Sequence, residues 1–143
     1  MLAKKWETME VLAKHKKGEY HIGTVKELLS GSLTKYVITW LDKTETVVEA
    51  IHVFGGLTPL RKLRVNDHVL APVTTDGPKN PLCYLPGVVV EKNTNVTVTI
   101  KMIRSHRPDD HTTIDEKECF YISPLYYFTA AADYLNNHHA DDR

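Results

Sequence analysis

The sequence predicts an all-β fold of two small five-stranded barrels in tandem, followed by a short C-terminal helix. Two observations lead to this prediction. An internal repeat divides the chain, and both copies contain short β-rich runs bounded by turn residues. The length agrees with it, because 143 residues are enough for two very small domains or for one ordinary domain.

The repeat is visible in two short strings. Val11-Leu12-Ala13 recurs as Val69-Leu70-Ala71. In each copy a polar, glycine-containing stretch then leads to a Tyr-x-x-Gly-x-Val string, which begins at Tyr20 in the first copy and at Tyr84 in the second. Such self-similarity indicates that one structural unit is used twice.

The remaining strands are predicted from side-chain type. Residues 36–40 and 96–100 are rich in β-branched and aromatic side chains, and residues 47–53 and 120–122 close the two units. Such residues at period two, bounded by Gly, Asn and Asp, are typical of strands. Because the strands are short and closely spaced, small barrels are favoured over units in which strands alternate with helices. The polar stretch at residues 107–111 is interpreted as a loop.

Four glycines are placed by the same reasoning. Gly18 and Gly31 fall where hairpin turns need a positive φ. Gly23 and Gly87 fall inside predicted strands, which indicates a bulge or a tight barrel bend at each.

These elements give the expected boundaries. We assign residues 1–59 to the first barrel with an N-terminal arm, 60–128 to the second barrel, and 129–143 to the C-terminal helix and tail. Helical character already begins near residue 124, where a proline precedes a run with internal alanines. The residues before Met9 form either a short helix or an irregular arm.

Composition and charge narrow the class of protein. Apolar residues make up 42% of the chain and charged residues 25%, the balance of a soluble globular protein. Eighteen basic residues face eighteen acidic ones, so the net charge is zero and binding of nucleic acid by bulk charge is disfavoured. A local basic patch keeps nucleic acid as a weaker alternative; its lysines are Lys4, Lys5, Lys14, Lys16, Lys17 and Lys26.

The sequence also predicts the compartment. No apolar run reaches the roughly 18 residues of a membrane helix, and the first residues lack the apolar core of a secretory signal. Cys83 and Cys119 are the only cysteines, too few for a disulfide scaffold. We therefore expect an intracellular protein with no membrane partner.

No motif indicates catalysis, a cofactor or a metal. The sequence has no glycine-rich phosphate loop and no nucleophile elbow. The eight histidines, including His106, His111 and the pair at 138–139, lack ligand spacing combined with cysteine or carboxylate pairs. We expect a non-enzyme without cofactor or metal.

The repeated string resembles the Tudor family of SH3-like barrels. The resemblance rests on Val-Leu-Ala, a short loop, Gly-x-Tyr-x-x-Gly-x-Val and then Val-x-Trp-x-Asp, and it is closest over residues 9–54. The second unit, residues 65–124, is similar through the strings at 65–71 and 84–88. The pair also resembles the paired Tudor-like domain of some von Willebrand A domain-containing proteins.

The resemblance implies an aromatic cage for methylated lysine or arginine at one rim of the first barrel. Aromatic faces attract a methylammonium ion, and a nearby carboxylate adds attraction. Carried onto this chain, the cage positions are His15, His21, Trp40 and Asp42. His15 and His21 stand where such readers usually have Trp, Tyr or Phe. Tyr20, next to the cage position, is expected to face the core.

The second unit is expected to have no cage. Its corresponding positions are Val73 and Leu85, neither of which is aromatic, and Tyr84 is expected to be a core residue like Tyr20. The resemblance thus implies a non-catalytic binding module that reads methylated peptides, such as those of histones in chromatin, through the first barrel, and it favours the nucleus over the cytoplasm. Two alternatives stay open: a protein–protein interaction scaffold without a cage, and nucleic-acid binding through the N-terminal lysines.

Overall fold

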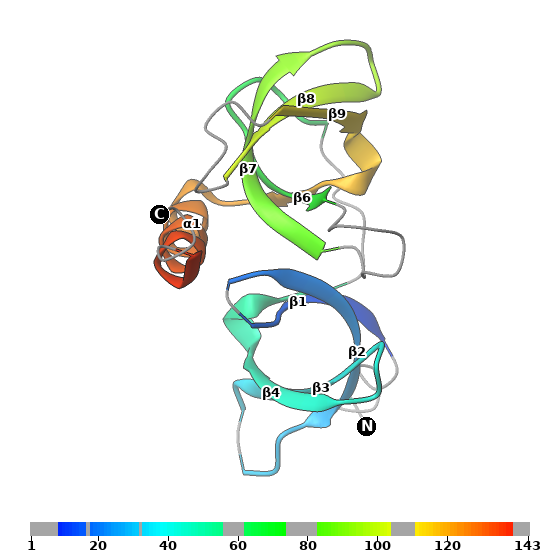
Figure 1. The fold of residues 1–143 in the computed structure, drawn as a ribbon. Coiled ribbons are helices and arrows are strands. Elements are labelled where there is room, and N and C mark those ends of the chain that lie inside the picture. The colour runs from blue at the N-terminus through cyan, green and yellow to red at the C-terminus, as the bar shows by residue number, and fades with distance from the viewer. Residues whose placement is uncertain are drawn as a thin grey trace. The chain divides into compact units, whose positions relative to one another are not determined.

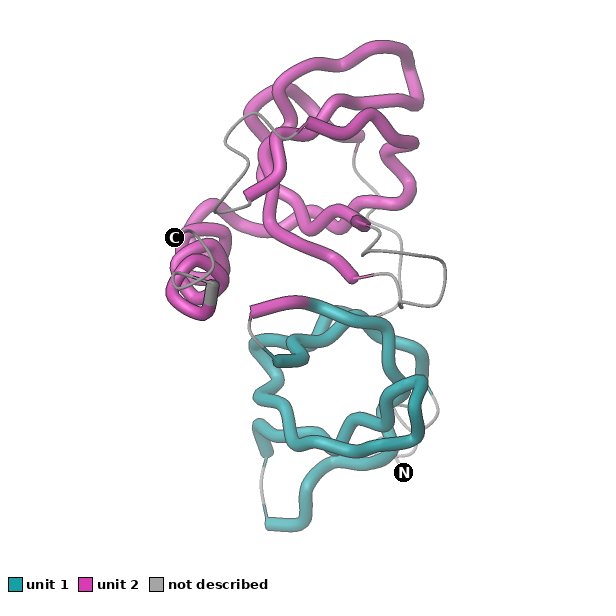
Figure 2. The backbone as a smooth tube through the Cα atoms, in the orientation of Figure 1, with its two compact units in different colours: residues 1–16, 20–57 teal, residues 17–19, 58–143 magenta. Residues whose placement is uncertain are grey.

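The computed structural model describes residues 9–16, 18–31, 33–55, 62–73, 83–103 and 111–138 (Figure 1). The chain divides into two compact units (Figure 2). The first contains Met1–Lys16 and Tyr20–Leu57, and the second contains Lys17–Glu19 and Thr58–Arg143. The predicted arm before Met9 and most of the predicted linker lie outside the described residues.

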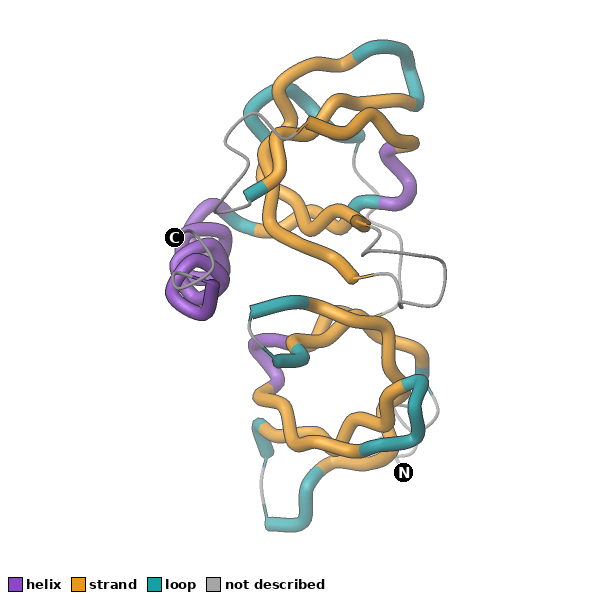
Figure 3. Tube along the Cα trace, viewed as in Figure 1, coloured by secondary structure: helices purple, strands orange, loops and turns teal. Residues whose placement is uncertain are grey.

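The first unit is a five-stranded antiparallel barrel, as predicted (Figure 3). Its β1–β2, β2–β3 and β3–β4 pairs are antiparallel neighbours along the chain, and the last strand returns to pair with β1. The strands are β1 (Glu10–Lys14), β2 (Tyr20–Leu28), β3 (Lys35–Trp40), β4 (Glu45–Glu49) and β5 (Val53–Gly55).

The second unit repeats this topology and adds a helix. Its neighbouring strands pair in order from β6 to β9, and β10 returns to β6. The fold class predicted from the sequence is therefore confirmed. The elements are β6 (His68–Val73), β7 (Cys83–Lys92), β8 (Thr97–Met102), β9 (His111–Asp115), β10 (Phe120–Ile122) and α1 (Pro124–His138).

Two details of the strands differ from the expectations. Residues 47–53 are not one strand, because β4 ends at Glu49 and a 3-10 turn, Ala50–His52, precedes β5. His111 does not lie in a loop but begins β9. Neither difference leaves a clear trace in local composition, because strand formation depends on packing against neighbouring strands.

The turn glycines behave as predicted, whereas the strand glycines serve another purpose. Gly18 and Gly31 have φ angles of 75° and 79°. The register shifts in the long strands lie two residues beyond Gly23 and Gly87, at Val25/Glu27 and Val89/Glu91. At Gly23 a Cβ would lie 2.7 Å from Ile38 Cγ2, so glycine is required there because β3 packs so closely.

Each barrel has its own apolar core. The first is built from alternating residues of β1, β2, β3 and β4: Val11, Ala13, Val25, Ile38, Trp40 and Val48. The second contains the repeat equivalents of several of these, together with both cysteines and a helix residue: Leu63, Val69, Ala71, Val73, Cys83, Leu85, Val89, Val98, Ile100, Met102, Cys119 and Tyr134. Tyr20 and Tyr84 are both buried, as expected.

The helix α1 begins at a well-formed N-terminus. The hydroxyl of Ser123 accepts a hydrogen bond from the Tyr126 amide at 3.1 Å, and Pro124 occupies the first helical position. Ala130, Ala131 and Tyr134 form its buried face, whereas Leu125, Phe128 and Leu135 are exposed.

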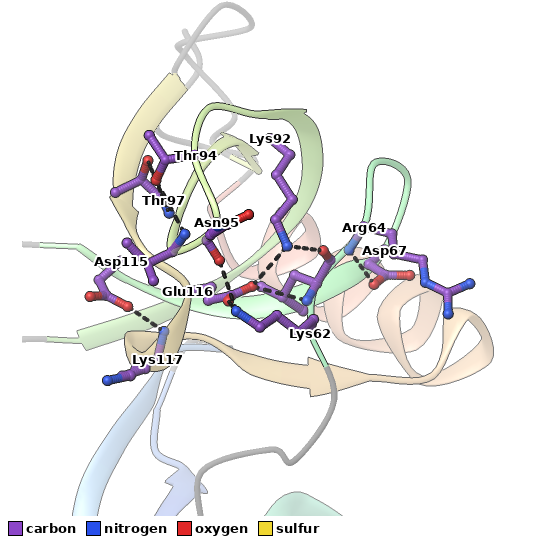
Figure 4. A network of polar contacts seen from close by, with 12 residues as sticks. Lys62, Arg64, Asp67, Lys92, Thr94, Asn95, Thr97, Asp115, Glu116 and Lys117 are labelled. Atoms are coloured by element: carbon purple, nitrogen blue, oxygen red, sulfur yellow. Dashed lines mark hydrogen bonds and ion pairs between the residues drawn. The ribbon is translucent and has the colours of Figure 1, made fainter.

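A polar network holds the segment before β6 against the second barrel (Figure 4). Glu116 Oε1 accepts a hydrogen bond from the Leu63 amide at 3.0 Å and lies 3.4 Å from Lys92 Nζ. Lys92 Nζ in turn donates to the Leu63 carbonyl at 3.0 Å. Both polar groups of the Leu63 backbone are thus satisfied while its side chain enters the core.

Candidate functional site

The side chains expected to form a cage gather at one rim of the first barrel. His15 follows β1, His21 lies near the start of β2, and Trp40 ends β3. The His15 ring centroid lies 4.7 Å from that of His21 and 4.5 Å from that of Trp40, and the His21 and Trp40 centroids are 6.4 Å apart. We call His15, His21, Trp40 and Asp42 the rim cluster.

Strand register explains why these side chains meet. Ala13 pairs with His21 across β1 and β2, and Gly23 pairs with Trp40 across β2 and β3. A Cβ on Gly23 would lie 3.0 Å from Trp40 Cε3, so the indole fits beside β2 because residue 23 has no side chain. The glycine of the repeated string therefore makes room for the indole of Trp40 in the rim cluster.

Trp40 belongs to both the core and the rim. Its side chain is 4% exposed and packs in the first core cluster. Its Nε1 donates a hydrogen bond to Thr46 Oγ1 of β4 at 2.9 Å, which fixes the ring plane. Both histidine rings meet the indole nearly edge to face, at interplanar angles of 83° for His15 and 80° for His21. Thr46 was not anticipated from the sequence.

Asp42 lies in the turn that joins β3 to β4. Lys43, with a φ of 75°, donates its amide to the Trp40 carbonyl, and the Asp42 carboxylate accepts bonds from the Thr44 hydroxyl and, at 3.0 Å, the Thr44 amide. These bonds, led by the hydroxyl, lower the pKa of Asp42 from its ordinary value, and positive charge on His15 lowers it further. The carboxylate is thus ionised at neutral pH and lies within the electrostatic reach of the rim cluster.

The three rings are in direct contact. Aromatic pairs touch when their centroids are about 4.5–7 Å apart, so the 4.5 Å between His15 and Trp40 leaves no space for a methylammonium group between them. His15 is the side chain that fills this space. It is half-buried, and it also faces an open pocket.

That pocket, which we call the edge pocket, has a volume of about 390 Å³. One wall is strand β4, and the other is the chain that leaves β1. The lining residues are Lys14, His15, Lys16, Thr46, Val47, Val48, Glu49 and His52. Sequence reasoning placed Lys14 and Lys16 in a general basic patch and did not foresee a pocket. No local sequence pattern indicates this pocket, because the pocket forms only where β4 lies beside the end of β1.

Within its described residues, the second unit has no aromatic side chain at the positions equivalent to His15, His21 and Trp40. Val73 and Leu85 are buried apolar residues, as their types suggest. The partner of Gly87 across β7 and β8 is Met102, which takes the place that Trp40 has in the first barrel. Aligning Ile38-x-Trp40 with Ile100-x-Met102 identifies this substitution from the sequence. The two strings that revealed the repeat do not include these positions.

Other chemistries find little support in the described part of the chain. No group of three His, Cys, Asp or Glu side chains there is arranged to hold a metal ion. Burial raises the pKa of the Cys119 thiol to about 12, so it stays protonated and is a poor nucleophile. Among the helices of the described residues, none is long and apolar enough to cross a membrane.

Two antiparallel barrels in tandem, in each of which the last strand returns to pair with the first, define a tandem Tudor-like fold. Two solved structures share it. AGD34 of Arabidopsis thaliana AGDP1 has a TM-score of 0.53 and 14% identity, over 85% of this chain and 86% of that one. The tandem Agenet domain 3-4 of ADCP1 has a TM-score of 0.51 and 14% identity, over 85% and 84%.

The family is established by sequence. Residues 8–134 match the model described as a domain of unknown function, DUF4537, and the chain belongs to that family. A search of curated proteins finds no match.

Proposed function

We propose that this chain is a non-catalytic binding module whose first barrel reads a methylated lysine or arginine side chain of a peptide. The observation that carries the proposal is the rim cluster, in which the rings of His21 from β2, Trp40 from β3 and His15 from the segment after β1 meet beside an ionised carboxylate. Aromatic faces and a nearby negative charge are the two features that attract a methylammonium ion.

Binding requires a rearrangement of one side chain. Trp40 is held by the core and by Thr46, whereas His15 lies beyond the end of β1 and faces the edge pocket. The proposal is that His15 turns toward the edge pocket and that the methylammonium group takes its place against the indole. Trp40, His21 and Asp42 then surround the cation.

The proposal also covers the identity of the ligand and the location of the protein in the cell. A methylated histone peptide in chromatin is the favoured ligand, and the nucleus is the favoured location. The alternative function is that of a protein-interaction scaffold without a working cage. Association with a von Willebrand A domain stays a prediction from the resemblance.

Nucleic-acid binding is less well supported. Lys4, Lys5 and Lys17 lie outside the described residues, and Lys26 forms an ion pair with Glu45 at 3.1 Å. A steep loss of oligonucleotide affinity with added salt would favour this alternative.

The direct test is calorimetric titration with two peptides that differ only in methylation of one lysine. A cage reader binds the methylated peptide at least about tenfold more tightly, a difference of roughly 1.4 kcal/mol. Replacing His21→Tyr should strengthen binding, because a phenol ring is a better partner for the cation than imidazole. Equal affinity for both peptides in the two proteins would contradict the cage assignment and leave the scaffold alternative.

A further inference from the structure

Strand β4 is an edge strand of the first barrel. Within the described residues, β4 pairs with β3 alone. An edge strand presents a row of backbone N–H and C=O groups that can pair with another extended chain. Whether β4 does so depends on which of its backbone groups face outward and on what lies beside them.

The hydrogen-bond pattern identifies the outward-facing groups. Trp40 N donates to Thr44 O at 2.9 Å, and Ala50 N donates to Thr34 O at 2.7 Å. Hydrogen-bonded and non-hydrogen-bonded pairs alternate along an antiparallel ladder. Thr46 and Val48 therefore bond to β3, whereas the amide and carbonyl of Val47 point away from it.

The edge pocket runs along this same edge. Four consecutive residues of β4, numbers 46–49, line it. Successive side chains of a strand point to opposite faces, so four consecutive lining residues mean that the pocket follows the backbone edge itself. The Val47 side chain is 51% exposed there. An extended peptide placed in the pocket would lie alongside the outward groups of Val47.

The wall opposite β4 is positively charged. Lys14 and Lys16 both line it. The carboxylate that lines the pocket, Glu49, lies 3.7 Å from Lys35 Nζ on β3, so part of its charge is offset from the other side. The pocket thus offers a peptide a hydrogen-bonding edge on one side and lysine ammonium groups on the other.

We propose that an extended acidic peptide adds to β4 as a further strand, with its main chain bonded to Val47 and a carboxylate side chain directed toward Lys14 and Lys16. Strand addition of this kind gives affinity through the main chain and specificity through side-chain pockets. The interaction goes beyond the reading of a methylated side chain, because it needs neither methylation nor the Trp40 ring.

The probe is a fluorescein-labelled hexapeptide of alternating valine and glutamate, titrated into the full chain by fluorescence anisotropy. Two matched peptides test the two halves of the proposal. In one, lysine replaces glutamate; in the other, the amides along one edge are N-methylated, and both methylation registers are made. We expect the lysine peptide, and one of the two methylated registers, to bind at least about tenfold more weakly.

Protein variants test the same two halves. Lys16→Glu should weaken the glutamate probe about tenfold, whereas Lys101→Glu, an equal charge change on the exposed side of β8, should not. Val47→Pro should keep the fold, because its N–H does not bond to β3, and should weaken the probe about tenfold. Val48→Pro, which removes a ladder bond, should lower the melting temperature instead.

Hydrogen exchange gives a readout that does not depend on any variant. Saturating glutamate probe should slow exchange of the Val47 amide at least about tenfold while leaving the Val98 amide of the second barrel unchanged. Equal binding of the lysine peptide, or an unprotected Val47 amide at saturation, would overturn the proposal. The methyl-lysine assignment fails separately, because this probe contains no lysine and His21→Tyr should not alter its affinity.

Discussion

Gly23 shows how one residue position sets the geometry of the rim. It pairs with Trp40 across β2 and β3, and it has an ordinary strand conformation, so its value lies in the missing side chain. A glycine in a strand read from sequence alone indicates a bulge or a bend. The close approach of Ile38 and Trp40 explains it instead, and such an approach depends on packing across strands that sequence spacing does not reveal.

The substitution Gly23→Ala should therefore destabilise the protein. The new Cβ would lie 2.7 Å from Ile38 Cγ2 and 3.0 Å from Trp40 Cε3, and overpacking of this kind costs about 1–3 kcal/mol. Gly87→Ala should behave alike, because its Cβ would lie 2.5 Å from Ile100 Cγ2. Denaturant unfolding measures the stability of both variants. A loss of unfolding free energy below about 0.5 kcal/mol in either variant would show that the neighbouring side chains move to accommodate the added methyl group.

The histidines of the rim cluster predict a dependence of binding on pH. A protonated imidazole repels a methylammonium group, and histidine is the side chain whose charge most readily changes between about pH 7.5 and 5.5. Affinity for a methylated peptide should fall across this range. Asp42, whose pKa is lowered, stays ionised throughout and so cannot cause the loss.

Calorimetric titration at several pH values measures this effect. His52, Lys14, Lys16 and Glu49 also line the adjoining edge pocket, and His52 is the histidine among these four. The variant His52→Gln is therefore the control, and it should keep the pH dependence. His21→Tyr should flatten it. Constant affinity from pH 7.5 to 5.5 in the unmodified protein would mean that neither rim histidine touches the ligand.

At the scale of elements, the repeat predicted most of the strands because each strand carries its own local pattern. The paired strings at Val11 and Val69, and those at Tyr20 and Tyr84, fall in β1, β6, β2 and β7. The elements that were not predicted are those without such a local pattern. The 3-10 turn at Ala50–His52 and the polar strand β9 (sequence HTTID) contain no local signal that distinguishes them from a strand and a loop.

The rim cluster was predictable only through the resemblance, and the edge pocket was not predictable at all. Lys14 and Val47 are distant in sequence and have no motif in common. They line the same pocket only because the folded chain brings β4 beside the end of β1. Strand register fixes which residues are neighbours across one strand pair, but it does not fix the distance between β4 and the end of β1.

The 3-10 turn at Glu116–Glu118 yields a prediction for stability. Burial alone would raise the pKa of Glu116, but bonds from the Leu63 amide and from Lys62, with the charge of Lys92, outweigh it and lower the pKa. A lowered folded-state pKa means that the ionised carboxylate stabilises the fold fully above the ordinary value, and that this stability is lost as pH falls through the folded-state pKa.

Glu116→Gln should accordingly destabilise the protein at pH 7 by about 1–3 kcal/mol, because Lys92 and the Leu63 amide lose a charged acceptor. It should also flatten the decline in stability below about pH 4.5. Glu118→Gln is the matched control, since it removes an exposed carboxylate from the same turn. Denaturant unfolding between pH 3 and 7 compares the three proteins. Equal stability of the two variants at pH 7 would show that the network contributes nothing.

At the scale of the whole molecule, one topology has been used twice with different contents. Both barrels repeat the strand order, the glycine and the register shift, but Trp40 in the first is replaced by Met102 in the second. Each of these side chains belongs to the core of its own barrel. We therefore expect the difference between the units to concern binding and not stability, so that the second barrel serves as an internal control for the first.

Alanine at these two equivalent positions separates the roles. Trp40→Ala should cost about 3–5 kcal/mol and Met102→Ala about 2–5 kcal/mol, because both side chains fill a core. Only Trp40→Ala should remove the preference for a methylated peptide over its unmodified form, since a methionine side chain lacks the aromatic face that attracts a methylammonium ion. Thermal melts and calorimetric titrations are made on both variants, at a temperature where circular dichroism shows each to be folded. If Trp40→Ala keeps the preference, the tryptophan is a core residue alone, and if Met102→Ala loses it, binding of the methylated peptide is not confined to the first barrel.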